Sequence, residues 1–180
     1  MAASLIEGKF ASWKRLGHEL KKRSLDPVGH FSFVSYFFVA VVIFGGAGIW
    51  TELRSYMYFV ATPEQPCPSL ASLRTAVITF FPALAGSSCM QLIWAEDHER
   101  SLRAFAVVVL TALIVAIFFI TPDGVSDRAA IAGGTAASVL ALWSWWIANA
   151  KQKDLLDPDA ATGGKVTGGD LPGNLDDFKV

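Results

Sequence analysis

Residues 104–120 read AFAVVVLTALIVAIFFI, and this stretch decides the fold class. It contains no formal charge, and at ~1.5 Å per residue it is long enough to cross the hydrocarbon layer of a bilayer. Twelve of its residues are Val, Ile, Leu or Phe, which favour insertion by about 4 to 7 kcal/mol at roughly 0.3 to 0.6 kcal/mol each. The stretch therefore predicts a transmembrane helix that can lie directly against lipid.

Three further stretches resemble it, at residues 31–50, 75–95 and 129–149. Each lacks Asp, Glu, Lys and Arg, and none has the alternating pattern of a barrel strand. Only 17% of the chain is charged, against about a quarter in soluble domains, and the charges gather at 7–26, 96–103 and 151–179. We predict an all-α polytopic membrane protein with four transmembrane helices in a domain over residues 28–150.

The segment before the first span, residues 1–27, predicts a cytoplasmic amphipathic helix. Apolar residues from Ile6 to Leu20 recur every three or four positions, and most basic residues lie elsewhere around the helix. Such a helix lies in the headgroup layer and gains about 1 kcal/mol per basic residue from anionic lipid. Packing on the soluble domain of a partner is the alternative. The candidate lipid-surface residues are Lys9, Trp13, Lys14, Arg15, Lys21, Lys22 and Arg23.

The segment after the last span, residues 151–180, predicts a disordered cytoplasmic tail. From Asp154 onward it has paired glycines, two prolines, six aspartates and two lysines, too little apolar surface to offset the entropy of ordering. Its last apolar residues, Leu175, Phe178 and Val180, would suit a docking peptide for a partner.

Basic residues near the span ends predict the orientation. Ten Lys and Arg residues lie on the side of the two termini and three, Arg54, Arg74 and Arg128, on the other. The positive-inside rule then places both termini in the cytoplasm, with a bacterial inner membrane as the expected location. Three tryptophans at the end of the fourth span, Trp143, Trp145 and Trp146, fit an aromatic belt at the cytoplasmic interface.

The fourth span is built largely from small residues. These recur four apart in two registers, Ala130-Gly134-Ser138 and Ala129-Gly133-Ala137-Ala141. Small residues let helix backbones approach closely in a membrane. We therefore expect this helix to pack against helices rather than lipid, and the protein to form a homo-oligomer.

The second span combines a proline with a cluster of polar residues. Pro82 is expected to interrupt the hydrogen-bond ladder, and polar groups at this depth need partners. Two interpretations stay open: the polar residues line a pore or small binding site, or they bond to adjacent backbones and hold a bundle or oligomer together. The candidate helix-packing or pore-lining residues are Thr79, Pro82, Ser87, Ser88, Gln91, Gly134 and Ser138.

Signals for catalysis or for cofactors are weak. No span contains the ionisable residue that marks ion-coupled transport, no glycine-rich phosphate loop is present, and no histidine lies at the depth of Ser87 and Ser88. A metal site near the cytoplasmic surface could be formed by His30 and His98 with Glu96, Asp97 and Glu99. A solvated, charge-rich turn explains the same residues without a metal. A disulfide between Cys67 and Cys89 is not expected, because Cys89 lies well inside the second span.

A basic surface helix, four spans and a short tail resemble the layout of small bacterial membrane subunits that work with a separate soluble protein, among them the membrane component of the Kiwa anti-phage system. The resemblance covers architecture and no motif. It implies a small membrane subunit that anchors, recruits or senses a cytoplasmic partner in bacterial stress or anti-phage defence. We expect the protein to have no enzymatic activity, no cofactor, no metal and no direct contact with nucleic acid. The alternatives are an oligomeric channel lined by the second span and, third, a membrane enzyme using Ser88, His98 and Glu99.

Overall fold

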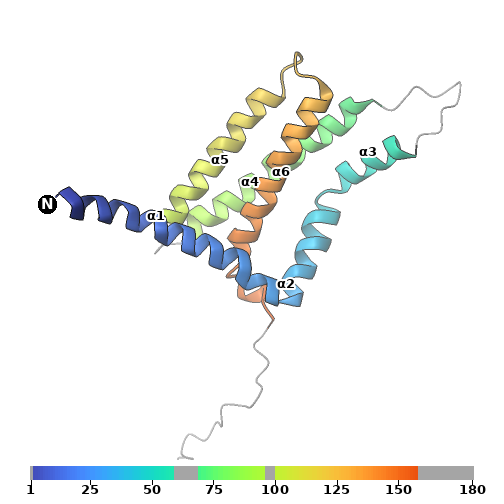
Figure 1. Cartoon of the computed structure of the whole chain (residues 1–180). Coiled ribbons are helices and arrows are strands. Elements are labelled where there is room, and N and C mark those ends of the chain that lie inside the picture. Colours follow the sequence, from blue (N-terminus) through green and yellow to red (C-terminus); the bar gives the residue numbers. More distant parts are fainter. Residues whose placement is uncertain (1, 59–68, 96–99, 158–180) are drawn as a thin grey trace, which may run out of the picture.

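The computed structural model describes residues 2–58, 69–95 and 100–157, and every regular element in these ranges is a helix (Figure 1). In chain order the elements are α1 (Ala2–Leu25), the 3-10 turn η1 (Asp26–Gly29), α2 (Phe31–Tyr36), the π-helical η2 (Phe37–Phe44), α3 (Ala47–Met57), α4 (Leu70–Ala95), α5 (Arg100–Ile120), α6 (Asp127–Asn149) and the 3-10 turn η3 (Lys153–Leu155). The expected tail beyond residue 157 and the loop that contains Cys67 lie outside the described residues.

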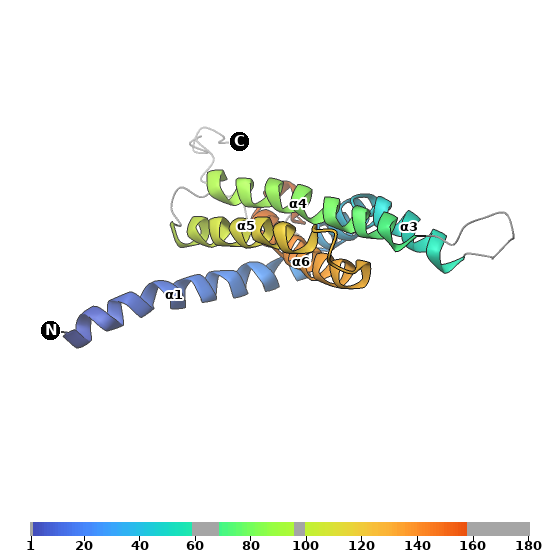
Figure 2. The same ribbon diagram turned by 90° about the horizontal axis from the view of Figure 1, so that it is seen from above.

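Helices α4, α5 and α6 form a bundle, and each is long and apolar enough to cross a membrane (Figures 1 and 2). They contain the spans expected at 75–95, 104–120 and 129–149 and extend each toward its N-terminus. A fourth candidate span arises only if residues 13–29 and 31–44 are joined across a 95° bend. The chain is therefore an all-helical protein with three to four helices able to span a membrane.

The first expected span, residues 31–50, is not one continuous helix, which corrects the sequence-based prediction. Helix α2 widens into η2, where the Gly45 amide donates to the Ala40 carbonyl five residues back at 3.0 Å. The chain then turns at Gly45 and Gly46 before α3 begins. A Cβ on Gly46 would lie 2.5 Å from the Val42 carbonyl oxygen, so this turn requires a residue without a side chain.

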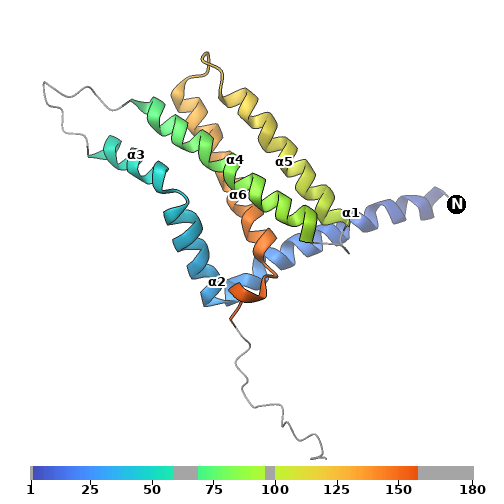
Figure 3. The ribbon, with the colours of Figure 1, turned by 180° about the vertical axis from the view of Figure 1, so that it is seen from behind.

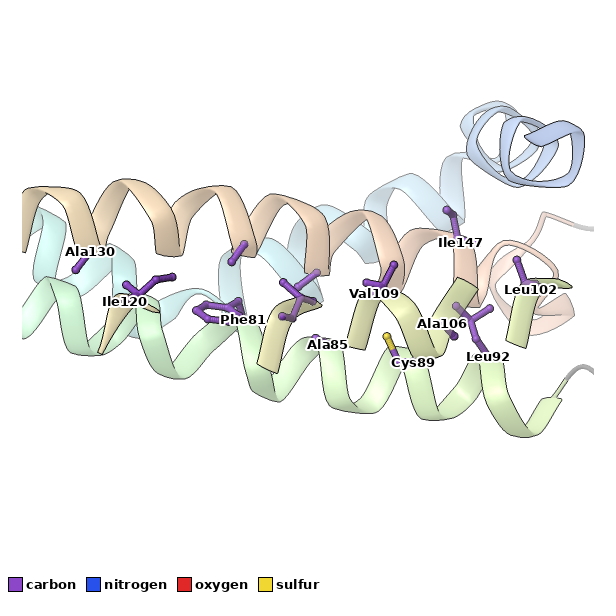
Figure 4. Packing of buried hydrophobic residues seen from close by; sticks show 13 residues of the cluster. Phe81, Ala85, Cys89, Leu92, Leu102, Ala106, Val109, Ile120, Ala130 and Ile147 are labelled. Carbon is purple, nitrogen blue, oxygen red and sulfur yellow. The ribbon is translucent and has the colours of Figure 1, made fainter. Parts of the chain in front are cut away.

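The core of the bundle lies between α4, α5 and α6 (Figure 4). Phe81, Ala85 and Cys89 of α4 are fully buried there. Helix α6 contributes mainly small side chains: its buried residues are Ala130, Gly134, Ala137, Ser138, Ala141, Ser144, Ile147 and Asn149. These small residues allow α6 to lie close against α4, because their short side chains leave little distance between the two backbones.

Helix α5 exposes several large apolar residues on the side away from the core. Val108, Phe118 and Phe119 are 65%, 74% and 74% exposed. In a bilayer this apolar surface would contact acyl chains, which agrees with the strong insertion tendency of residues 104–120.

One end of the bundle brings together the end of α1, the start of α2 and the end of α6, and we call it the junction end (Figure 3). Glu19 of α1 pairs with Arg23 at 2.9 Å and with Lys151, just after α6, at 2.7 Å. The Trp146 indole nitrogen donates to the Ser24 carbonyl at 3.2 Å, and Trp143 donates to the Ser24 hydroxyl at 3.2 Å. The contacts of Lys151, Trp143 and Trp146 hold α1 against the end of α6, whereas the Glu19–Arg23 pair lies within α1.

The opposite end, which we call the turn end, is held by Arg74 of α4. Its guanidinium donates to the carbonyl oxygens of Ile120, Thr121, Pro122 and Val125 and to the Asp127 carboxylate, at 2.8–3.2 Å. Carbonyls at the C-terminus of a helix have no partner within the helix. Arg74 supplies that partner for the last residue of α5 and also fixes the turn into α6.

Candidate functional site

A polar face of α4 is the strongest candidate for a site in the membrane domain. Thr79, Ala83, Ser87 and Gln91 recur every four residues, so they lie one above another on the same side of the helix. All four are exposed. This side of α4 faces the segment of residues 31–57, which comprises α2, η2 and α3 and which we call the α2–α3 segment (Figure 3).

Two hollows lie along this face, each of about 450 Å³. The hollow nearer the turn end is mostly apolar, and its lining residues are Gly45, Gly48, Ile49, Ala76, Thr79, Phe80, Ala83, Leu84 and Ser87. The hollow at the junction end is mostly polar, and its lining residues are Tyr36, Ser87, Gln91, Trp145, Asn149, Gln152 and Leu155. Ser87 lines both hollows, so they are adjacent, and we call them together the α4 groove.

Hydroxyl groups on this face bond to the backbone of their own helix. Thr79 donates to the Thr75 carbonyl at 2.9 Å and to the Ala76 carbonyl at 3.0 Å, and Ser87 donates to the Leu84 carbonyl at 3.0 Å. Their oxygen lone pairs remain able to accept a hydrogen bond from a ligand. The hydroxyls thus make the face polar without leaving a donor unsatisfied.

Amide and phenol groups at the junction end differ from these hydroxyls. Within the described ranges, the Gln91 and Gln152 side chains and the Tyr36 hydroxyl make no hydrogen bond to the protein, whereas Asn149 donates to the Trp145 carbonyl at 2.9 Å. An unpaired amide that faces hydrocarbon is costly. The polar hollow therefore offers free donors and acceptors to an incoming molecule.

The candidate residues of the second and fourth spans separate into two groups. Thr79, Ser87 and Gln91 line the α4 groove, whereas Ser88, Gly134 and Ser138 are buried in the bundle. A Cβ on Gly134 would lie 2.6 Å from Cγ1 of Val77, so this glycine sets the closeness of α4 and α6.

The hydroxyls of the buried group bond within their own helices. Ser138 donates to the Gly134 carbonyl at 2.8 Å, and Ser88 donates to the Leu84 carbonyl. Pro82 lines neither hollow. It has no N–H to donate to the Ile78 carbonyl, so one bond of the ladder is missing, but α4 stays helical from Leu70 to Ala95.

Candidate lipid-surface residues lie on α1, and most of them are exposed. Trp13 is 72% exposed, and Lys14, Arg15, Lys21 and Lys22 are also exposed. Arg23 is only 2% exposed and pairs with Glu19, which removes it from the exposed basic surface. The side chain of Lys9 lies outside the part of the chain whose side chains are described.

Two of the three tryptophans at the end of α6 contact aromatic residues of the α2–α3 segment. Phe33 of α2 is fully buried, and its ring lies 4.8 Å from that of Trp146 in an edge-to-face contact. Trp145 stacks on Tyr36 with ring centroids 6.0 Å apart. This cluster joins the α2–α3 segment to α6, and neither Phe33 nor Arg74 carries a local sequence signal that would have revealed its partners.

Metal-binding and thiol chemistry gain no support from the described residues. Among them no group of three His, Cys, Asp or Glu side chains is placed to hold a metal ion, and residues 96–99 lie outside that part of the chain. Cys89 is a buried free thiol, and Cys67 lies outside the description. The α4 groove is lined by hydroxyl, amide and aromatic groups without a charged side chain, which suits binding rather than acid–base catalysis.

Comparison with known proteins adds no family to this picture. No protein-family model, no curated protein and no solved structure matches the chain. The function must therefore be argued from the site itself.

Proposed function

We propose that this protein is a non-enzymatic membrane subunit whose helix α1 lies on the cytoplasmic lipid surface and recruits or senses a soluble partner. The observation that carries the proposal is the fixed position of α1. Residues 13–29 make an angle of 95° with residues 31–44. If residues 31–44 enter the bilayer, this angle turns α1 into the plane of the membrane surface.

The contacts at the junction end support a fixed rather than a freely moving α1. The ion pair between Glu19 and Lys151 and the indole hydrogen bonds from α6 to Ser24 act on the second half of the helix. Leu16 and Leu20 pack against the bundle core. A helix held at one end in this way presents the rest of its surface in a constant orientation, which suits a recruiting surface.

The exposed side chains of α1 support contact with anionic lipid. Four exposed basic residues, Lys14, Arg15, Lys21 and Lys22, together favour binding by about 4 kcal/mol at roughly 1 kcal/mol each. Trp13 supplies an aromatic group suited to the interface. We extend the proposal to a bacterial inner membrane, to both termini in the cytoplasm, and to a setting of stress or anti-phage defence.

A depth measurement tests the lipid part of the proposal. A spin label can be attached at Gly17, where a Cβ meets nothing within 4 Å, after Cys67 and Cys89 are replaced by serine and alanine. In vesicles containing phosphatidylglycerol we expect the label to lie at headgroup depth, and to move toward water when the four basic residues are changed to glutamine. A label that is equally aqueous in both proteins would contradict the proposal.

Partner recruitment requires its own experiment. The same four-residue variant should lose a co-purifying soluble protein after cross-linking in native membranes, while still pelleting with membranes. Arg54 and Arg128, exposed basic residues toward the turn end, provide the matched control when changed to glutamine. Recovery of no partner with the unchanged protein, or equal recovery with all variants, would reject recruitment.

Homo-oligomerisation stays part of the proposal, but the small residues of α6 lend it less support than expected. Gly134 packs on Val77 of α4, and a Cβ on Gly133 would lie 3.4 Å from Ile120 of α5. Both registers are thus used largely within one protomer, so an oligomer would need other faces. Native mass spectrometry of the protein in nanodiscs measures the copy number, and a strict monomer would remove this part.

A second candidate function is permeation through an oligomer, and the α4 groove is the observation that favours it. Thr79, Ser87 and Gln91 line one continuous face. Reconstituted vesicles should then conduct ions or small uncharged solutes, and Ser87→Leu should block the flux. Vesicles without flux would reject this candidate and leave the recruiting function standing.

A further inference from the structure

The α4 groove changes in chemistry along its length. Toward the turn end its walls are Ile49, Phe80, Leu84 and the bare backbone of Gly45 and Gly48, with Thr79 as a minor polar element. Toward the junction end its walls carry the amides of Gln91, Asn149 and Gln152 and the Tyr36 hydroxyl. One end can therefore hold hydrocarbon, and the other can hold a hydrogen-bonding group.

The polar end carries no charged side chain in its lining. The lining offers no counter-ion to the head of a phosphatidylglycerol, a fatty acid or an amine. Hydroxyl and ester groups would instead find both donors and acceptors in the amides of Gln91 and Gln152. The lining thus favours an uncharged polar head.

Size and access agree with a lipid-like molecule. Each hollow holds about 450 Å³, within the range of roughly 300 to 1,000 Å³ typical of small-molecule sites. Both hollows are partly open. A molecule already dissolved in the bilayer could therefore enter sideways.

We propose that the α4 groove binds an amphiphile with an uncharged hydroxyl- or ester-bearing head and a hydrocarbon chain, of the monoacylglycerol or diacylglycerol class. The head lies between Tyr36, Gln91 and Gln152, and the chain runs past Ser87 and Ala83 toward Gly45. This proposal is independent of the recruiting function, because it assigns a ligand to a surface that α1 does not form.

The turn at Gly45 and Gly46 helps to form one wall of the apolar hollow. The turn at these glycines ends the π-helical η2 and directs α3 along the apolar hollow. If residues 31–50 formed one straight helix, Ile49 and Gly48 would follow a different path and the apolar hollow would lose that wall. The break in the first expected span is therefore what shapes the binding site.

Photo-cross-linking in nanodiscs tests the proposal. The probe is a monoacylglycerol with a diazirine in its chain, compared with a fatty acid of the same chain length. We expect the neutral probe to label residues 76–91 and to be retained more than the acid. Ala83→Trp fills the groove and should reduce labelling about tenfold. Ala112→Trp, on the exposed side of α5, is the matched control and should leave it unchanged.

A milder variant guards against misfolding of the tryptophan substitution. Gln91→Leu removes one hydrogen-bonding group and should weaken the neutral probe roughly fivefold, the effect of a single net hydrogen bond, without altering retention of a probe that lacks the head. Equal labelling in Ala83→Trp and Ala112→Trp, stronger binding of the acid, or cross-links to the chain's own residues 158–180 or to a second copy would each overturn the proposal.

Discussion

The Lys151 ammonium lies 2.7 Å from the Glu19 carboxylate, although one residue follows the last long helix and the other belongs to the first. The same carboxylate accepts from Arg23 at 2.9 Å. Glu19 is 18% exposed and Arg23 is 2% exposed. The Glu19 carboxylate therefore forms ion pairs with two cationic side chains, of which Arg23 is buried.

Replacing this carboxylate should destabilise the junction end. We expect Glu19→Gln to lower the free energy of unfolding by about 1 to 3 kcal/mol, because the buried Arg23 guanidinium loses a charged acceptor. Lys151 is 51% exposed, so Lys151→Met should cost less than about 1 kcal/mol. Thermal unfolding in detergent, followed by circular dichroism, measures both. Equal effects of the two substitutions would show that Arg23 does not depend on Glu19.

Gly134 should tolerate no side chain while Val77 is in place. Gly134→Ala would bring a methyl group within 2.6 Å of Val77 Cγ1 and should cost about 1 to 3 kcal/mol of stability through overpacking. Val77→Ala in the same protein should recover part of that loss. Gly86→Ala in α4 is the control, because its Cβ meets nothing within 4 Å, and it should stabilise the helix by up to about 1 kcal/mol.

The hydrogen bonds of Arg74 should stabilise the turn between α5 and α6 against local unfolding. Arg74→Met removes hydrogen bonds to four carbonyls and to Asp127 and should cost about 2 to 4 kcal/mol. Hydrogen exchange of residues 121–126 should accelerate more than that of the helix interiors. Arg128→Met, at an exposed site in the first turn of α6, should leave exchange within a factor of about two. Slow exchange in the Arg74 variant would refute this role.

Asp157 should make the start of α2 sensitive to acid. The hydroxyl and amide of Ser32 both donate to its carboxylate, and the hydroxyl bond is the main reason that the pKa of Asp157 lies below its ordinary value of 3.8. A lowered folded-state pKa means that the contribution to stability is present above pH 3.8 and is lost as the pH falls through the lower value.

Titration of the Asp157 carboxyl carbon by NMR measures this pKa directly. Ser32→Ala removes the hydroxyl and should raise the midpoint toward 3.8. An unchanged midpoint in the Ser32 variant would show that the hydroxyl does not set the pKa.

The sequence predicted the helical spans better than their contacts. Residues 75–95 and 129–149 lie within α4 and α6 because hydropathy over a full span is a strong signal that does not depend on neighbours. The prediction of one continuous helix over residues 31–50 was wrong, because hydropathy does not detect a turn between apolar residues. Gly45 and Gly46 are apolar enough for a membrane, but the backbone around them leaves no room for a Cβ and turns there.

Partners far apart in the sequence were the second source of error. The sequence identifies Arg74 only as a charge near a span end, yet its side chain binds a turn that begins 47 residues later. The sequence places Ser87 and Ser88 in one polar cluster, but neighbouring positions on a helix point about 100° apart. Ser87 therefore faces the α4 groove, and Ser88 faces the core. The polarity of the second span was visible in the sequence, and the division of its residues between groove and core was not.

The shared use of Glu19 has a consequence for biogenesis. During translation α1 leaves the ribosome before α6, which carries the tryptophans that bind Ser24, and before Lys151. A nascent chain that has not yet inserted α6 therefore lacks most of the contacts that hold its first helix. Helix α1 is therefore synthesised well before the residues that hold it in place.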